Sequence, residues 1–226
     1  MLKFLPFLLA GLYAVAMYKF SSWRMARELD ARSTRLVDPA LTKEIKKLAQ
    51  AMEVDDIPVY IYQIDPINGL AAPDGRVFIT KGFYEKFLKG DVSAAEMASV
   101  IAHEIGHVAL GHSRRRMIDF GGQNAMRMAL GALLSRFIPW VGMYIANMVA
   151  NLLMAKLSRS DEFEADAYAT ALMQQSGIGA QAQITMFEKL GALTGNVNTP
   201  PAWMLSHPKT DDRIAAIRAN LDRWSD

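Results

Sequence analysis

Two histidines spaced four residues apart, His103 and His107, are the side chains whose types and spacing most clearly allow chemistry. On a helix, residues four apart are rotated by only about 40°, so both imidazoles project from one face. An H-E-x-x-H run of this kind is a typical source of two zinc ligands, with Glu104 placed to act as a base on a metal-bound water. An ordinary amphipathic helix with two exposed histidines would show the same five residues. His112 lies about 180° further around the same helix and is expected to be structural.

A third metal ligand is expected elsewhere, because a catalytic zinc normally has three protein ligands and one open position. The acidic stretch at 161–166 offers four carboxylates, and only Glu162 and Asp166 among them are four residues apart. We expect Glu162 to bind the metal and Asp166 to accept a hydrogen bond from the other ring nitrogen of a histidine ligand. Without the histidine pair this run would indicate a solvated helix face, and Glu164 is expected to lie on one.

The composition indicates a folded domain with membrane contact. The chain has 226 residues, of which 51% are hydrophobic, and a formal charge of +2. This length permits one domain with an appendage, and the nearly balanced charge argues against nucleic acid as a partner. Because cysteine is absent, disulfides and cysteine zinc sites are excluded. Histidines and carboxylates are then the strong zinc ligands that the chain can offer.

The N-terminal hydrophobic run from Phe4 to Tyr18 predicts a membrane anchor or a signal segment within residues 1–23. Fifteen residues are short for a span of about 20, but Lys19 and flanking aromatic side chains can extend the run to the interface. We expect an anchor in an inner membrane of bacterial type, and the basic residues after the run favour a cytoplasmic catalytic domain. The sequence at 14–16 also fits a signal-peptidase site, and cleavage there would make the protein periplasmic.

The candidate side chains must be positioned by the elements around them. The sequence patterns of these elements predict an α+β, mainly helical domain over residues 38–226, after a linker at 24–37. A capping box at Ser93 and Glu96 begins the histidine helix, whose apolar residues predict burial. Pattern and turn signals predict the other elements. They are a helix that begins at 38–39, a strand at 59–64, a hairpin at 69–80, and helices at 81–88, 158–174, up to 192, and 209–223.

Residues 117–157 predict a hydrophobic helical hairpin. The uncharged stretch at 137–155 is long enough to span a membrane. A single crossing, however, would place the histidine pair and Glu162 on opposite sides of the membrane. The segment at 120–134 is too polar to supply a second crossing. We therefore expect the hairpin to pack on the domain or to lie against the bilayer.

Three separated motifs resemble a known family. They are H-E-I-G-H-V-A-L-G-H at 103–112, S-R-x-x-E-x-x-A-D at 158–166 and S-H-P at 206–208. In order and spacing they are similar to the membrane-associated zinc metallopeptidases, which include HtpX, BepA and the CAAX prenyl protease. The resemblance implies a gluzincin fold, one Zn²⁺ per chain, a protein or peptide substrate, and a role in membrane or envelope protein quality control. It also implies that His207 lies near the metal, as an oxyanion stabiliser or a resting-state ligand, and that Arg213 pairs with an acid near the site.

The expected activity is that of a zinc endopeptidase. Glu104 would take a proton from the metal-activated water and pass it to the leaving amine. An edge strand within 69–80 would hold the peptide extended, and membrane lipid would be a second partner. The alternative is a membrane-tethered chaperone or binding protein with a structural zinc that His207 closes as a fourth ligand. Glu104 distinguishes the two, because a structural site has no need of a carboxylate there.

Overall fold

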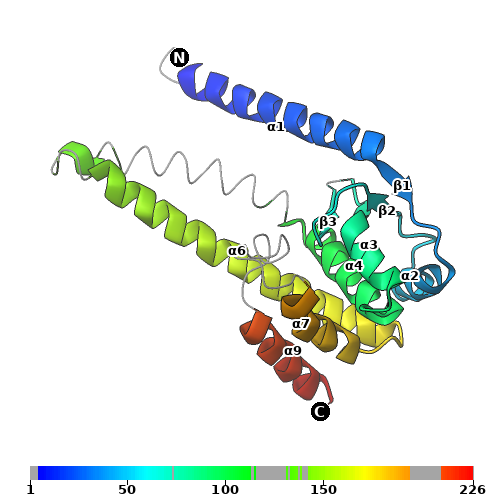
Figure 1. Cartoon of the computed structure of the whole chain (residues 1–226). Coiled ribbons are helices and arrows are strands. Elements are labelled where there is room, and N and C mark those ends of the chain that lie inside the picture. Colours follow the sequence, from blue (N-terminus) through cyan, green and yellow to red (C-terminus); the bar gives the residue numbers. More distant parts are fainter. Residues whose placement is uncertain are drawn as a thin grey trace.

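The computed structural model describes residues 5–72, 74–112, 115, 131, 133–136, 138, 142–193 and 210–225 (Figure 1). Helix α4, Ala94–Ala109, lies between a small sheet and the helices that follow it in the chain. These later helices are α6, Gly142–Gln175, α7, Gln181–Leu193, and α9, Thr210–Ser225. The described part is mainly helical with a single four-stranded sheet, which confirms the predicted α+β class.

The sheet has the strand order β1-β2-β4-β3. Strands β2, Val59–Tyr62, and β4, Val77–Thr80, are parallel, and β3, Gly69–Ala71, pairs with β4 as the predicted hairpin. Strand β1, Ser33–Arg35, pairs antiparallel with β2 and was not predicted from the sequence. The order makes β3 an edge strand of the described sheet, and this strand contacts α4.

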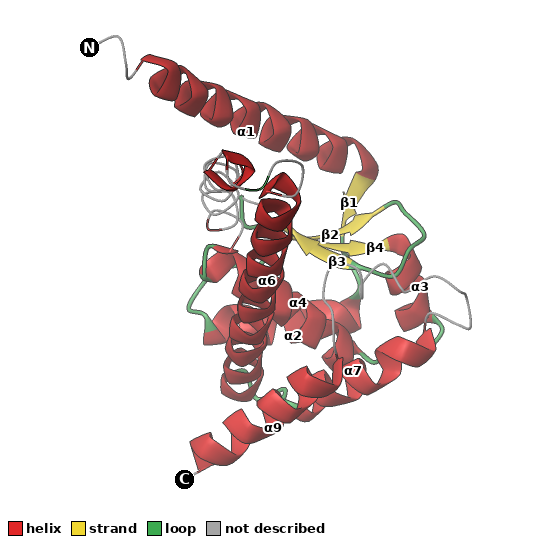
Figure 2. Cartoon of the chain, turned by 90° about the vertical axis from the view of Figure 1, so that its left-hand side faces the viewer, coloured by secondary structure: helices red, strands yellow, loops and turns green. Residues whose placement is uncertain are grey.

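The two faces of the sheet are covered by different helices (Figure 2). Val77 and Ile79 point to the main core, where they pack with α4 and with α2, Pro39–Ala51. On the other face, Leu29 of helix α1, Leu5–Arg32, packs with the aromatic side chains of β2 and β4. Helix α4 is therefore packed between the sheet and α6, which carries the acidic side chains of the candidate site.

The start of α4 is fixed as the sequence predicted. The Ser93 hydroxyl accepts a hydrogen bond from the Glu96 amide, and the Glu96 carboxylate accepts one from the Ser93 amide. Glu96 also receives Lys189 of α7, with Nζ 2.9 Å from Oε2. Every residue from Glu96 to His107 is buried, which confirms the expectation that this helix is internal.

The end of α4 differs from the expectation. The helix stops at Ala109, and Gly111 has a φ of +66°, a left-handed conformation that glycine adopts without a steric penalty. The chain therefore turns at Gly111, and His112 does not continue the helical path that placed it opposite the metal.

Helix α6 is a single helix of 34 residues, so the predicted helix start at Ser158 is wrong. The physical reason is visible in the sequence, since no glycine or proline interrupts residues 143–175. Most of the first half of the predicted hairpin lies outside the described residues. The other predicted helices are present as α2, α3, Lys81–Leu88, α7 and α9.

Helix α1 extends through the predicted linker up to Arg32, where β1 begins. Within the described ranges, none of the helices is both long and apolar enough to cross a membrane. The predicted N-terminal span is therefore not confirmed.

Candidate metal centre

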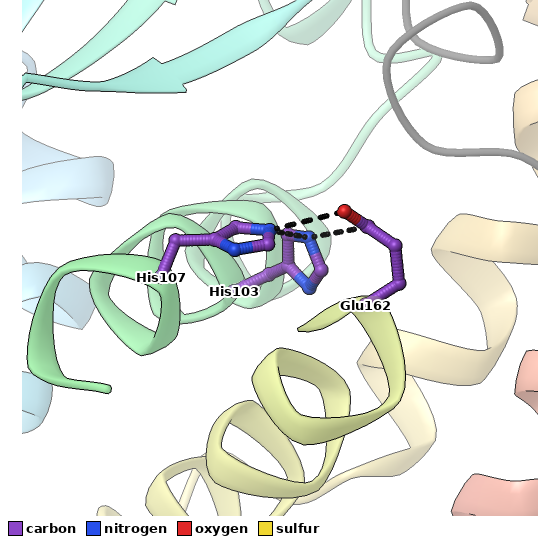
Figure 3. Close-up of side chains that lie close together, drawn as sticks. All are labelled: His103, His107 and Glu162. Carbon is purple, nitrogen blue, oxygen red and sulfur yellow. Dashed lines mark hydrogen bonds and ion pairs between the residues drawn. The ribbon is translucent and has the colours of Figure 1, made fainter. Parts of the chain in front are cut away.

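Three potential metal ligands converge from two helices (Figure 3). His103 and His107 come from α4, and Glu162 comes from α6. The two Nε2 atoms are 3.1 Å apart, and each lies 3.4 Å from one of the Glu162 carboxylate oxygens. All three side chains are buried. The structure thus brings together the two histidines and the carboxylate that the spacing had selected.

The spacing of these atoms fits zinc. A tetrahedral zinc with its ligands at about 2.0–2.1 Å separates neighbouring ligand atoms by about 3.3–3.4 Å. The separation of 3.1 Å between the two nitrogens and the 3.4 Å from each nitrogen to its nearer Glu162 oxygen lie close to that value, and one ligand atom from each residue can be chosen within 4.8 Å of the others. Two imidazole nitrogens and one carboxylate oxygen are also the donor set of known catalytic zinc sites, which keep the fourth position for water or substrate.

The ring nitrogen of His103 that faces away from this cluster is held by Asp166. The His103 Nδ1 and Asp166 Oδ1 atoms are 2.9 Å apart. Asp166 in turn receives Arg213 of α9 through two hydrogen bonds, from Nε at 2.6 Å and from Nη2 at 2.7 Å. Arg213 is buried with its guanidinium over the Phe187 ring, 4.4 Å from the centroid. A row of three side chains therefore fixes the orientation of this imidazole.

The charges of this row support one another. Burial alone would raise the pKa of Asp166, but the Arg213 guanidinium and the contact with His103 hold it below the ordinary value. Burial lowers the pKa of His103, yet hydrogen bonds to Asp166 and Glu162 outweigh this effect and raise it to about 9. Burial also opposes the charge of Arg213, but Asp166 raises its pKa, so the guanidinium remains ionised.

The outward-facing nitrogen of His107 is held by His112, and here the sequence-based expectation was wrong. The two Nδ1 atoms are 2.8 Å apart, and the His112 ring is buried. The expectation assumed that α4 continues to residue 112, whereas the turn at Gly111 brings His112 back beside His107. A glycine one residue before the histidine was the sequence signal for this helix end.

Glu164 lies on a partly solvated face, as expected, with 41% of its side chain exposed, but it also contacts His112. Its Oε2 atom is 3.4 Å from His112 Nε2 and accepts a hydrogen bond from Arg115 Nη1 at 3.0 Å. Burial would raise the pKa of Glu164, but Arg115 and His112 hold it below the ordinary value. Asp161 lies nearby, with Oδ1 3.3 Å from Arg115 Nη1. Acidic side chains of α6 therefore lie behind both ligand histidines. Asp166 contacts His103 directly, and Glu164 contacts His112, which in turn contacts His107.

Glu104 is buried beside the edge strand. A Cβ atom added to Gly69 of β3 would lie 3.4 Å from the Cγ and Oε1 atoms of Glu104 and 3.0 Å from Val100. Glycine at position 69 thus lets β3 pack closely on Val100 of α4, with its main chain beside the Glu104 side chain.

The sequence of this region matches a known family. The sequence profile of peptidase family M48 matches residues 35–221, from β1 to the last helix. The chain belongs to peptidase family M48. This confirms the resemblance to membrane-associated metallopeptidases, and the chain is accordingly a metalloprotease.

Several relatives of this M48 peptidase are named as proteases. The chain is 29% identical to Metalloprotease LoiP of Escherichia coli over 91% of this chain and 81% of the relative. It is 29% identical to Metalloprotease YcaL of Escherichia coli over 79% of this chain and 69% of the relative. It is also 29% identical to the beta-barrel assembly-enhancing protease of Yersinia pestis, but it spans only 41% of that longer protein.

The remaining predicted site residue, His207, lies outside the described residues of this peptidase. Its placement near the metal stays a prediction from the family resemblance. Arg213, six residues later, is described and does pair with an acid of the site, as the resemblance implied.

Proposed function

We propose that the chain is an endopeptidase that holds one zinc ion with His103, His107 and Glu162 and uses Glu104 as its general base. The observation that carries the proposal is a buried cluster in which the two Nε2 atoms are 3.1 Å apart and each faces one oxygen of the Glu162 carboxylate at 3.4 Å. Glu104 belongs to the same helix turn as the two histidines, so the helix fixes its Cα atom relative to the ligands, and burial restricts its side chain.

In the proposed reaction the three ligands hold the metal and Glu104 transfers the proton. Zinc bound here would lower the pKa of a water to near 7 and polarise the scissile carbonyl. Glu104 would accept a proton from this water and return it to the leaving nitrogen, so that one peptide bond and one water give a carboxylate and an ammonium group. Burial of the histidines and Glu162 shields their charges from bulk water and strengthens their interactions.

The position of the edge strand β3 is evidence that the substrate is an extended polypeptide. Its main chain passes beside Glu104 because Gly69 has no side chain. A peptide that pairs with this edge would place its own main chain, and hence its scissile carbonyl, next to the base. Recognition through main-chain hydrogen bonds favours unfolded or extended protein segments over a single defined sequence.

The decisive experiment replaces Glu104 by glutamine. We expect Glu104→Gln to bind zinc as the wild type does and to lose at least about 100-fold in peptide cleavage, because general-base catalysis typically contributes that much. Glu85→Gln is a matched control, since the Glu85 side chain on α3 is about half exposed and its described ion pair is with Lys81. Zinc content by elemental analysis and casein cleavage give the two readouts. Cleavage by Glu104→Gln at the rate of the control would refute the mechanism and leave a structural zinc as the better explanation.

We also propose that the molecule works at a membrane surface. Large apolar side chains are exposed on α1 and on the first half of α6, and both helices extend to the same side of the molecule (Figure 1). They include Leu12, Tyr13, Phe20 and Trp23 of α1, and Tyr144, Met148 and Leu152 of α6. Aromatic residues among them are typical of a membrane interface. Paired Tyr144→Lys and Leu152→Lys substitutions should reduce co-sedimentation with phospholipid vesicles, whereas Val37→Lys, an exposed apolar residue elsewhere, should not.

The proposed biological role is quality control of membrane or envelope proteins. The name of the beta-barrel assembly-enhancing protease relatives supports this role, as does the apolar surface beside the catalytic domain. The Glu104→Gln variant provides a test, because it should retain substrates that it cannot cleave. Enrichment of misassembled membrane or envelope proteins after cross-linking in cells is expected. Enrichment of folded soluble proteins alone would contradict the role.

A further inference from the structure

The outward face of His107 is occupied by a second histidine rather than by a carboxylate. His107 presents Nε2 to the ligand cluster and Nδ1 to His112, with 2.8 Å between the two Nδ1 atoms. At this distance one of the two nitrogens must carry a proton and the other must accept it, because two bare nitrogens or two N–H groups would repel each other.

The proton positions follow from the surroundings. A nitrogen that binds a metal must be unprotonated, so a neutral His107 that offers Nε2 to the metal carries its proton on Nδ1. His112 Nδ1 is then the acceptor, and its own proton lies on Nε2. That nitrogen faces the Glu164 carboxylate at 3.4 Å, which Arg115 holds from the other side. Each donor in this row therefore meets an acceptor.

We infer that His112 is a positioning residue of the metal centre, which fixes His107 in the Nδ1–H form and directs its Nε2 atom to the metal. The inference rests on the proposed zinc site. It assigns to His112 the part that Asp166 plays for His103, with a neutral imidazole in place of an anion. His112 belongs to the turn after α4, so the helix end at Gly111 places it beside His107.

The structure shows why a substitution at His112 should reach the metal. His112 is buried, and so is His107. Removing the acceptor would leave the Nδ1–H group of His107 buried beside an apolar side chain, an arrangement that favours rotation of the ring or transfer of its proton to Nε2. Either change withdraws a ligand. Loss of an outer hydrogen-bond partner of a metal-binding histidine typically weakens metal affinity by about 10- to 100-fold.

The test compares His112→Leu, which removes the acceptor, with His112→Asn, whose side-chain oxygen can accept the same hydrogen bond. Zinc affinity of the full chain is measured by competition with a chromophoric chelator, and thermal unfolding of the metal-free protein reports on structural damage. We expect His112→Leu to bind zinc about 10- to 100-fold more weakly than the wild type and His112→Asn to recover most of the loss. Glu188→Gln, at an exposed ion pair with Arg218, is a control that should leave zinc affinity unchanged.

A second measurement needs no substitution. In ¹⁵N spectra of the zinc-loaded wild type, the inference requires zinc on Nε2 of His107 and a proton on Nδ1. Zinc on Nδ1 would overturn it even if the leucine variant fails to fold. Wild-type affinity in His112→Leu would also overturn it, as would equal weakening in both variants that follows their loss of metal-free stability. If the wild type itself binds no zinc, the proposed metal site fails and the inference fails with it, an outcome distinct from the others.

Discussion

Replacement of Arg213 by methionine should destabilise the fold more than any exposed charge replacement on the same helix. Arg213 is 1% exposed, and its guanidinium makes two hydrogen bonds to Asp166, at 2.6 and 2.7 Å. It also lies 3.5 Å from Glu162, another buried carboxylate. Methionine keeps the apolar contact with Phe187 but removes the guanidinium from both carboxylates, although His103 still contacts each of them. Removing one partner of a buried ion pair typically costs about 3–5 kcal/mol.

The assay is urea unfolding with a chelator present, so that metal binding does not contribute to the free energy of unfolding. Arg218→Met is the matched control, because Arg218 is on the same helix and pairs with Glu188 at 3.3 Å, where both side chains are at least half exposed. Exposed pairs contribute about 0–1 kcal/mol. The double variant Arg213→Met/Asp166→Asn should recover part of the loss, since it removes one of the two buried carboxylates that lose the guanidinium. The reasoning is refuted if Arg213→Met costs no more than Arg218→Met.

Two further substitutions test how α4 is held. Glu96→Gln should lower stability at pH 7 by about 1 kcal/mol, because glutamine keeps the cap but loses the charge that faces Lys189. The pKa of Glu96 lies below its ordinary value, so this contribution is present above about pH 4.5 and is lost as the pH falls through the lowered pKa. Unfolding curves of wild type and variant should then converge in acid. Gly106→Ala should cost about 1–3 kcal/mol and weaken zinc binding, because its Cβ would lie 3.0 Å from the Ala165 carbonyl oxygen and push α4 from α6. An alanine variant with unchanged stability and zinc affinity would show that this close approach is unimportant.

The ligand set could be predicted from the sequence because it depends on local geometry. His103 and His107 share a face on any helix because they are four residues apart. Glu162 and Asp166 share a face of α6 for the same reason. The capping box at Ser93 was equally local. None of these predictions required knowledge of how the two helices pack, and the structure places all four side chains in one cluster.

The features that the sequence did not predict are those that depend on where an element ends. His112 was placed on the wrong side because α4 was extended past Gly111, and a helical projection is meaningless beyond the last turn. Helix α6 was divided at Ser158, where the hydrophobic stretch of the predicted hairpin ends and the acidic run begins, although the helix continues through both. Strand β1 has three residues in a charged stretch, and only its pairing with β2 makes it a strand.

The burial of α4 explains why so many contacts converge on the site. A helix with no solvated face must find a partner inside the protein for each polar side chain that it carries. Glu96 is satisfied by Lys189 of α7, His103 by Asp166 of α6, and His107 by His112 of the following turn. These partners come from separate parts of the chain, so the metal centre is assembled only when α4 is packed on all sides. Metal binding and folding should therefore be coupled, with the ligands held in place by the same contacts that bury the helix.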